Sequence, residues 1–116
     1  MTLNDLEELL FQHQDTAYAD FSAKLIPTVP REKMIGIRSP EYKKIVKQIR
    51  DDPVVPVFLS ALPHKWHEEN CLHVALINQI RDYDTCVSAL EQFMPYIDNW
   101  AVNDMISPAC FRVLLR

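Results

Sequence analysis

Residues 39–50 read SPEYKKIVKQIR, and this stretch decides the fold class. Its apolar side chains recur at helical spacing: Tyr42, Ile45, Val46 and Ile49. Three basic side chains recur at the same spacing on the other face: Lys43, Lys47 and Arg50. Ser39 followed by Pro40 is typical of a helix N-terminus, with Ser39 as N-cap and Pro40 in the first helical position. The stretch therefore predicts an amphipathic helix with one apolar and one basic face.

Helical periodicity continues on both sides of this helix. Upstream, it predicts a helix after Thr2 that carries Leu3, Leu6 and Leu10, and a second that carries Tyr18, Phe21 and Leu25 and ends before Pro27. Pro30 opens a helical turn to Met34, which Gly36 ends. Downstream, helices are predicted at about 57–61, 64–81, 83–94 and 98–107, with Asp98 or Asn99 capping the last. No segment alternates with period two, so the sequence predicts an all-α fold.

The composition fits one small globular domain over residues 1–116. Hydrophobic residues make up 48% of the chain, which argues against disorder. No run of 18 apolar residues exists, so no membrane span is expected. The start, MTLND, is acidic, which excludes a signal peptide. Cys71, Cys86 and Cys110 are expected to be free thiols in a reducing cytoplasm.

The helices and short connections are typical of HEAT-like antiparallel pairs that form a short right-handed α-α superhelix. Successive units would span 40–62, 64–95 and 98 onward. The chain ends on apolar residues: Phe111, Val113, Leu114 and Leu115. From this ending we expect the N-terminal part of a longer fold, which would self-associate through its exposed C-terminal face.

Positive charge is concentrated in residues 31–50. This segment holds seven of the twelve basic residues and two acidic ones, a local charge of +5, whereas the whole chain carries −4. Four of the seven are candidates for binding phosphate groups: Arg38, Lys43, Lys47 and Arg50. The alternative is a solvated helix surface without a ligand.

Two further groups have spacings that suit chemistry. His67 and Cys71 lie four residues apart beside Glu68, as metal ligands on one helix face would, and His64 and His73 are further ligand candidates. No second cluster completes a site, so we predict neither metal nor cofactor; the alternative is a helix start stabilised by glutamate. Trp100 and Asp104 share a helix face and can hold a cationic ligand. The alternative there is a core tryptophan with a solvated aspartate.

Four stretches together resemble the DNA alkylation repair family, the AlkD-like alkylpurine DNA glycosylases. They are FSAKLIP at 21–27, IGIRSP at 35–40, HEE at 67–69 and YIDNWAVND at 96–104. The resemblance covers about residues 8–111. It implies HEAT-like helical pairs whose concave basic surface binds alkylated duplex DNA, and it assigns HEE a structural role.

The family's chemistry is hydrolysis of the N-glycosidic bond of cationic alkylated purines. By resemblance, Asp104 would stabilise the sugar as positive charge develops there and could orient water, while Trp100 would pack against the sugar–phosphate. Family members are about twice as long, so we expect little or no excision by the isolated chain. A non-catalytic scaffold that binds a protein or nucleic acid is the alternative.

Overall fold

The computed structural model describes the backbone of residues 1–114 and the side chains of residues 1–111. This part of the chain is all-α, as predicted, and contains no strand. Its α-helices are α1 (Leu3–Gln12), α2 (Thr16–Leu25), α3 (Ser39–Ile49), α4 (Val54–Ser60), α5 (His67–Asn78), α6 (Tyr83–Phe93), α7 (Trp100–Asp104) and α8 (Ala109–Leu114). Two 3-10 turns join them: η1 (Arg31–Lys33) and η2 (Met94–Tyr96).

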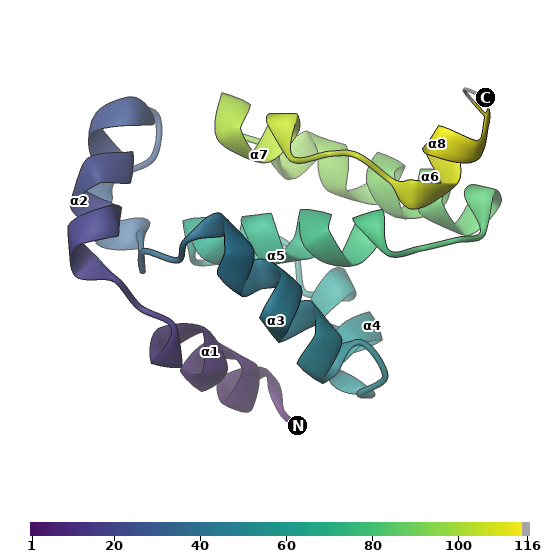
Figure 1. The fold of residues 1–116 in the computed structure, drawn as a ribbon, viewed down its shortest axis with the longest axis horizontal. Helices are drawn as coiled ribbons and strands as arrows, with labels where there is room; N and C mark the ends of the chain where they lie inside the picture. Colours follow the sequence, from purple (N-terminus) through teal and green to yellow (C-terminus); the bar gives the residue numbers. More distant parts are fainter. Residues whose placement is uncertain (115–116) are drawn as a thin grey trace.

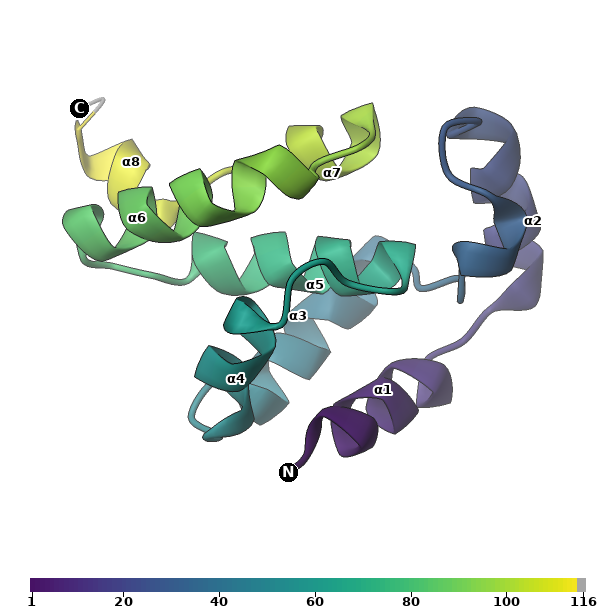
Figure 2. The same ribbon diagram turned by 180° about the vertical axis from the view of Figure 1, so that it is seen from behind.

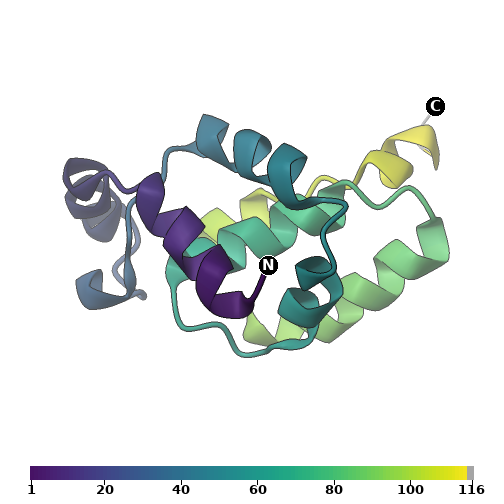
Figure 3. The same ribbon diagram turned by 90° about the horizontal axis from the view of Figure 1, so that it is seen from below.

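Helix α5 forms the middle of the molecule (Figures 1 and 2). It contacts α3 on one side and both α6 and α7 on the other, and α8 packs on α6. Seen from below in Figure 3, α1 lies beside α4, with which it is in contact. Helix α2 lies at one end of the molecule (Figure 1). None of the described helices combines the length and apolar character needed to cross a membrane.

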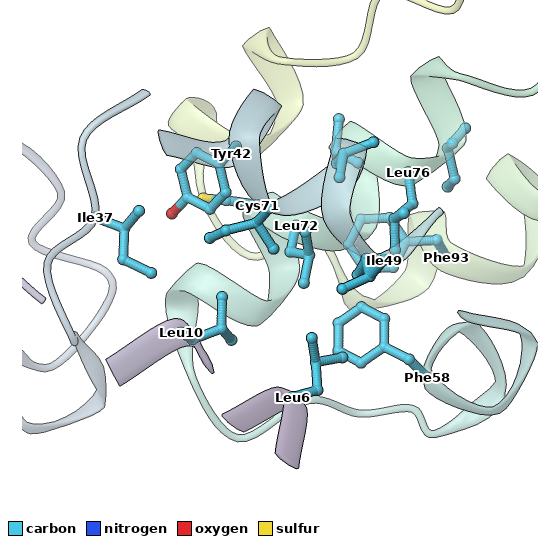
Figure 4. Close-up of a cluster of buried hydrophobic side chains, with 14 of the residues drawn as sticks. Leu6, Leu10, Ile37, Tyr42, Ile49, Phe58, Cys71, Leu72, Leu76 and Phe93 are labelled. Atoms are coloured by element: carbon cyan, nitrogen blue, oxygen red, sulfur yellow. The ribbon is translucent and has the colours of Figure 1, made fainter. Parts of the chain in front are cut away.

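One hydrophobic core joins α1, α3, α4, α5 and α6 (Figure 4). The predicted apolar face of α3 is buried as expected, and the middle of α5 is buried nearly all round. The largest fully buried side chains include Phe58 and Phe93. All three cysteines are buried and free, which confirms that they form no disulfide with one another. Burial of this much apolar surface is the main source of stability.

The predicted apolar stripe of α2 is wrong. Phe21 and Leu25 are 56% and 50% exposed, whereas Ala19 is fully buried. Helix α2 therefore turns a small residue toward the rest of the protein, and the reason lies at Gly36. Gly36 has a φ of 91°, and a Cβ there would lie within 3 Å of the Cβ of Ala19. Close backbone approach at this point requires small residues on both sides.

Gly36 also links α2, α3 and α5. Its carbonyl accepts a hydrogen bond of 2.7 Å from the Asp15 N–H, at the start of α2. Its own N–H donates to the Glu68 carboxylate at 3.0 Å, and the N–H of Ile35 donates to the other oxygen at 2.8 Å. Glu68 is 3% exposed, so this carboxylate satisfies two buried backbone donors. Glu68 thus anchors the loop that leads into α3.

Local capping moves several helix ends from their predicted places. Helix α3 begins one residue early, with Arg38 at the N-cap and Ser39 inside the helix. Helix α4 begins at Val54, where the Asp52 carboxylate accepts a hydrogen bond from the Val54 N–H. Helix α5 begins only at His67, because the Glu69 carboxylate accepts from the Trp66 N–H at 2.9 Å.

Helix α7 is much shorter than the predicted helix to about residue 107. Asn99 caps it as expected, since its side-chain oxygen accepts from the Val102 N–H at 2.9 Å. It ends at Asp104 because Asn78 of α5 binds the following backbone. The Asn78 amide donates to the Met105 carbonyl and accepts from the Ser107 N–H, both at 2.9 Å.

The chain continues into α8, where Phe111 lies near Tyr83 with ring centroids 5.6 Å apart. The predicted self-associating face falls mostly outside the described side chains, which do not include Val113, Leu114 and Leu115.

Candidate nucleic-acid interface

A hollow of about 430 Å³ follows the basic face of α3. Its other walls come from the C-terminal half of α5 and from the segment that links α7 to α8. Lys43, Lys47 and Arg50 all line it, and all three are exposed. Helical spacing grouped these residues correctly, and the structure places them in one concave surface.

The lysines of this hollow carry uncompensated charge. Neither Lys43 nor Lys47 forms an ion pair with any residue of the described part. Arg50 has a long contact of 3.9 Å with Asp51, which is 97% exposed and contributes little. The neighbouring Lys44 differs, because its ammonium binds Glu41 at 3.2 Å. The hollow is therefore an electropositive surface that can take an anion.

Arg38 lies apart from this group. Its Nε donates to the Asp15 carboxylate at 3.0 Å, and its guanidinium stacks over the Tyr18 ring, 4.9 Å from the centroid. Arg38 faces another hollow, together with Glu41 and His13. Hydrogen bonds from the Tyr18 N–H and from Arg38 lower the pKa of Asp15. The structure thus does not bring Arg38 together with the basic face of α3.

Trp100 and Asp104 lie at the two ends of α7. Trp100 is 56% exposed, and its Nε1 donates to the Leu25 carbonyl at 3.3 Å. The alternative of a core tryptophan is therefore wrong. Asp104 is exposed and forms no ion pair or hydrogen bond within the described part. Both side chains are accessible to a ligand.

A second, smaller hollow of about 150 Å³ connects the two regions. Trp100 and Tyr18 line it, and it shares three residues with the basic hollow: Ser39, Tyr42 and Met105. Asp104 itself lines neither hollow, but the next residue, Met105, lines both. The two hollows thus form one interrupted groove between α3 and the α7 region, and Asp104 is the sequence neighbour of one residue that lines it.

Sequence reasoning missed the two tyrosines of the smaller hollow. Helical spacing predicts apolar faces for Tyr18 and Tyr42. Tyr42 is 5% exposed, and burial, reinforced by Cys71 and Glu68, raises the pKa of its hydroxyl well above the ordinary value. The residue type alone could have indicated that these tyrosines line a polar site, since a tyrosine on a core face needs a polar site for its hydroxyl.

The residues of the metal-like motif, His67, Glu68 and Cys71, are buried and pack in the interior of the protein. His67 is buried, with its Nδ1 3.4 Å from the Asn99 amide nitrogen and its Nε2 3.6 Å from the Cys71 sulfur. Burial lowers the pKa of His67 and raises the pKa of Cys71 to about 12. Glu68 points instead to the backbone of Ile35 and Gly36. Within the described residues, no three potential ligands are arranged to hold a metal ion.

The other two histidines of this region form a separate pair. His64 Nε2 and His73 Nδ1 are 2.8 Å apart. The His64 ring stacks on Phe58 and the His73 ring on Phe93, with centroids 4.3 and 4.0 Å apart. Burial lowers the pKa of His64 to about 4 and that of His73 to about 3, so the pair is neutral at pH 7.

Comparison with known proteins identifies a family for this chain. The model of the family described as "DNA alkylation repair enzyme" matches residues 6–116. No curated protein and no solved structure matches the chain.

Proposed function

The chain belongs to the DNA alkylation repair enzyme family, and we propose that it binds duplex DNA around cationic, alkylated purines. The observation that carries this proposal is the basic hollow, in which Lys43, Lys47 and Arg50 lie together along a family-matched chain. Family membership supports a role in DNA repair. We also propose that the protein is specific for alkylpurines and that its helices form a HEAT-like superhelix.

Binding begins with the phosphate backbone. Lys43 and Lys47 have no ion pair to break within the described part, so phosphate oxygens can replace water around them at little cost. Each phosphate neutralised by a lysine or arginine releases bound counterions and tightens binding at low salt. Arg50 adds a third contact, since Asp51 holds it only at 3.9 Å. These contacts position the duplex and carry no sequence information.

The far end of the groove suits a sugar next to a damaged base. The exposed Trp100 ring can pack against the sugar, and Tyr18 lines the same hollow. Asp104, the last residue of α7, is exposed and forms no ion pair with any described residue. It attracts the positive charge of an N3- or N7-alkylated purine.

The reaction that these groups support is hydrolysis of the N-glycosidic bond. The electron pair of the bond between C1′ and nitrogen goes to the base, which leaves neutral because it was cationic. Positive charge passes to the sugar, where the Asp104 carboxylate stabilises it. A water oxygen then bonds to C1′, and Asp104 can orient this water and accept its proton.

A second candidate is a non-catalytic scaffold that binds a protein. The exposed apolar side chains of α2, Phe21 and Leu25, favour it, because such surface often marks a contact site. Binding to DNA distinguishes the two functions.

The test is the salt dependence of duplex binding, measured by fluorescence anisotropy with plain and methylated DNA. Because the sequence predicts little excision by the isolated chain, binding is the more informative measurement. Replacing both Lys43 and Lys47 with alanine should lower the slope of log K against log salt by about 2, one unit per phosphate contact. Lys44→Ala is the matched control, since Lys44 lies outside the hollow and already binds Glu41. No binding by the wild type, or equal slopes for all three proteins, would contradict the proposal.

A further inference from the structure

The side chain of Asn78 binds the backbone of the segment from Met105 to Ser107 at two points. Asn78, the last residue of α5, donates from Nδ2 to the Met105 carbonyl and accepts at Oδ1 from the Ser107 N–H. Both distances are 2.9 Å, and the partners lie 27 and 29 residues away in the sequence. A side-chain amide presents a donor and an acceptor side by side, as these two bonds require.

These two bonds determine where α7 ends. Asn78 occupies the Met105 carbonyl and the Ser107 N–H, which the longer helix predicted from the sequence would pair within itself. Asp104 is the last residue of α7 and directly precedes Met105. Asn78 also lines the basic hollow, in the wall that faces Lys43 and Lys47. One side chain thus lines the cationic hollow and also binds the segment that directly follows Asp104.

We infer that Asn78 is a positioning residue, an inference that rests on the proposed function. It fixes the distance between Asp104 and the basic face of α3, so that a duplex held by Lys43 and Lys47 presents its damaged base to the carboxylate. Asn78 does not itself contact the reacting atoms. Its loss leaves the phosphate contacts of α3 in place and displaces Asp104.

This role has a signature that a merely structural role lacks. Asn78→Ala should reduce the preference for methylated over plain duplex at least fivefold while leaving the salt slope unchanged. Asn78→Asp tests the donor alone, since its carboxylate can accept from the Ser107 N–H but repels the Met105 carbonyl. It should lose the preference as well. Gln92→Ala, which removes an exposed amide on α6, is the control and should bind as the wild type does.

All binding is measured at a temperature where circular dichroism shows each variant folded. Amide hydrogen exchange at Ser107, which needs no DNA, reports the Asn78 bond directly and should accelerate at least tenfold in Asn78→Ala. Wild-type exchange as fast as in the variant would overturn the inference. So would an unchanged lesion preference in both Asn78 variants. A wild type that does not bind DNA, with Ser107 still protected, would instead refute the proposed function.

Discussion

The buried carboxylate of Glu68 gives a prediction whose magnitude follows from the structure. Glu68→Gln keeps the shape of the side chain but replaces one acceptor oxygen with an NH2 group. One of the two backbone donors, Ile35 N–H or Gly36 N–H, then faces another donor in a site that is 3% exposed. An orphaned buried donor costs about 1–3 kcal/mol, and the remaining bond loses its charge assistance, about 1 kcal/mol more.

Removal of a buried charge opposes this loss, since the carboxylate no longer has to be desolvated. We expect the orphaned donor to dominate, because Glu68 satisfies both N–H groups in wild type. The net loss should be about 2–3 kcal/mol, a large part of the roughly 5–15 kcal/mol that stabilises a domain. At about 4 °C per kcal/mol for a domain of this size, the melting temperature should fall by about 10 °C.

Urea unfolding followed by circular dichroism measures this difference. Glu91→Gln, on the exposed side of α6, is the matched control and should change stability by less than about 0.5 kcal/mol. If Glu68→Gln is as stable as the wild type, then the two hydrogen bonds only offset desolvation, and Glu68 is not the anchor described above.

Two further predictions concern the same core. Gly36→Ala should destabilise the protein by at least about 2 kcal/mol, because φ is 91° and the new Cβ would meet the Asp15 carbonyl oxygen; unchanged stability in urea would contradict this packing. Stability should also fall as pH decreases below about 6.5, since the unfolded state then binds protons that the His64–His73 pair, with pKa values of about 4 and 3, does not. At pH 5 His73 alone should contribute a loss of about 2 kcal/mol. His73→Phe, which retains a ring against Phe93, should show a shallower dependence in urea titrations from pH 7 to 5, and an equal slope would refute this origin.

The features that the sequence predicts best are those that the spacing of residues within one helix determines. The apolar and basic faces of α3 follow from spacing within eleven residues, and both are found where expected. Helix α2 shows the limit of this reasoning. Its larger apolar residues predict the wrong buried face, because the close approach of Gly36 selects Ala19. That constraint comes from Gly36, which lies outside α2. The spacing of residues within α2 therefore cannot predict it.

In the candidate site, too, helical spacing predicts some features and tertiary contacts determine the others. The grouping of Lys43 with Lys47 in one hollow follows from helical spacing. The connection between this hollow and the one that Trp100 lines depends on tertiary contacts, through Tyr42 and Met105, which spacing cannot reveal. The early end of α7 has the same cause, since Asn78 reaches it from another helix.

Asp104→Asn tests the central claim most directly, through the ratio of affinities for methylated and plain duplex. Two unit charges about 8 Å apart interact by roughly 2 kcal/mol at an effective dielectric constant of about 20, so a preference of about thirtyfold is expected for the wild type. Asparagine keeps the shape of the side chain and removes its charge. The account predicts that the variant loses this preference and keeps the same salt slope. A variant that retains the full preference, or a wild type that has none, would contradict it.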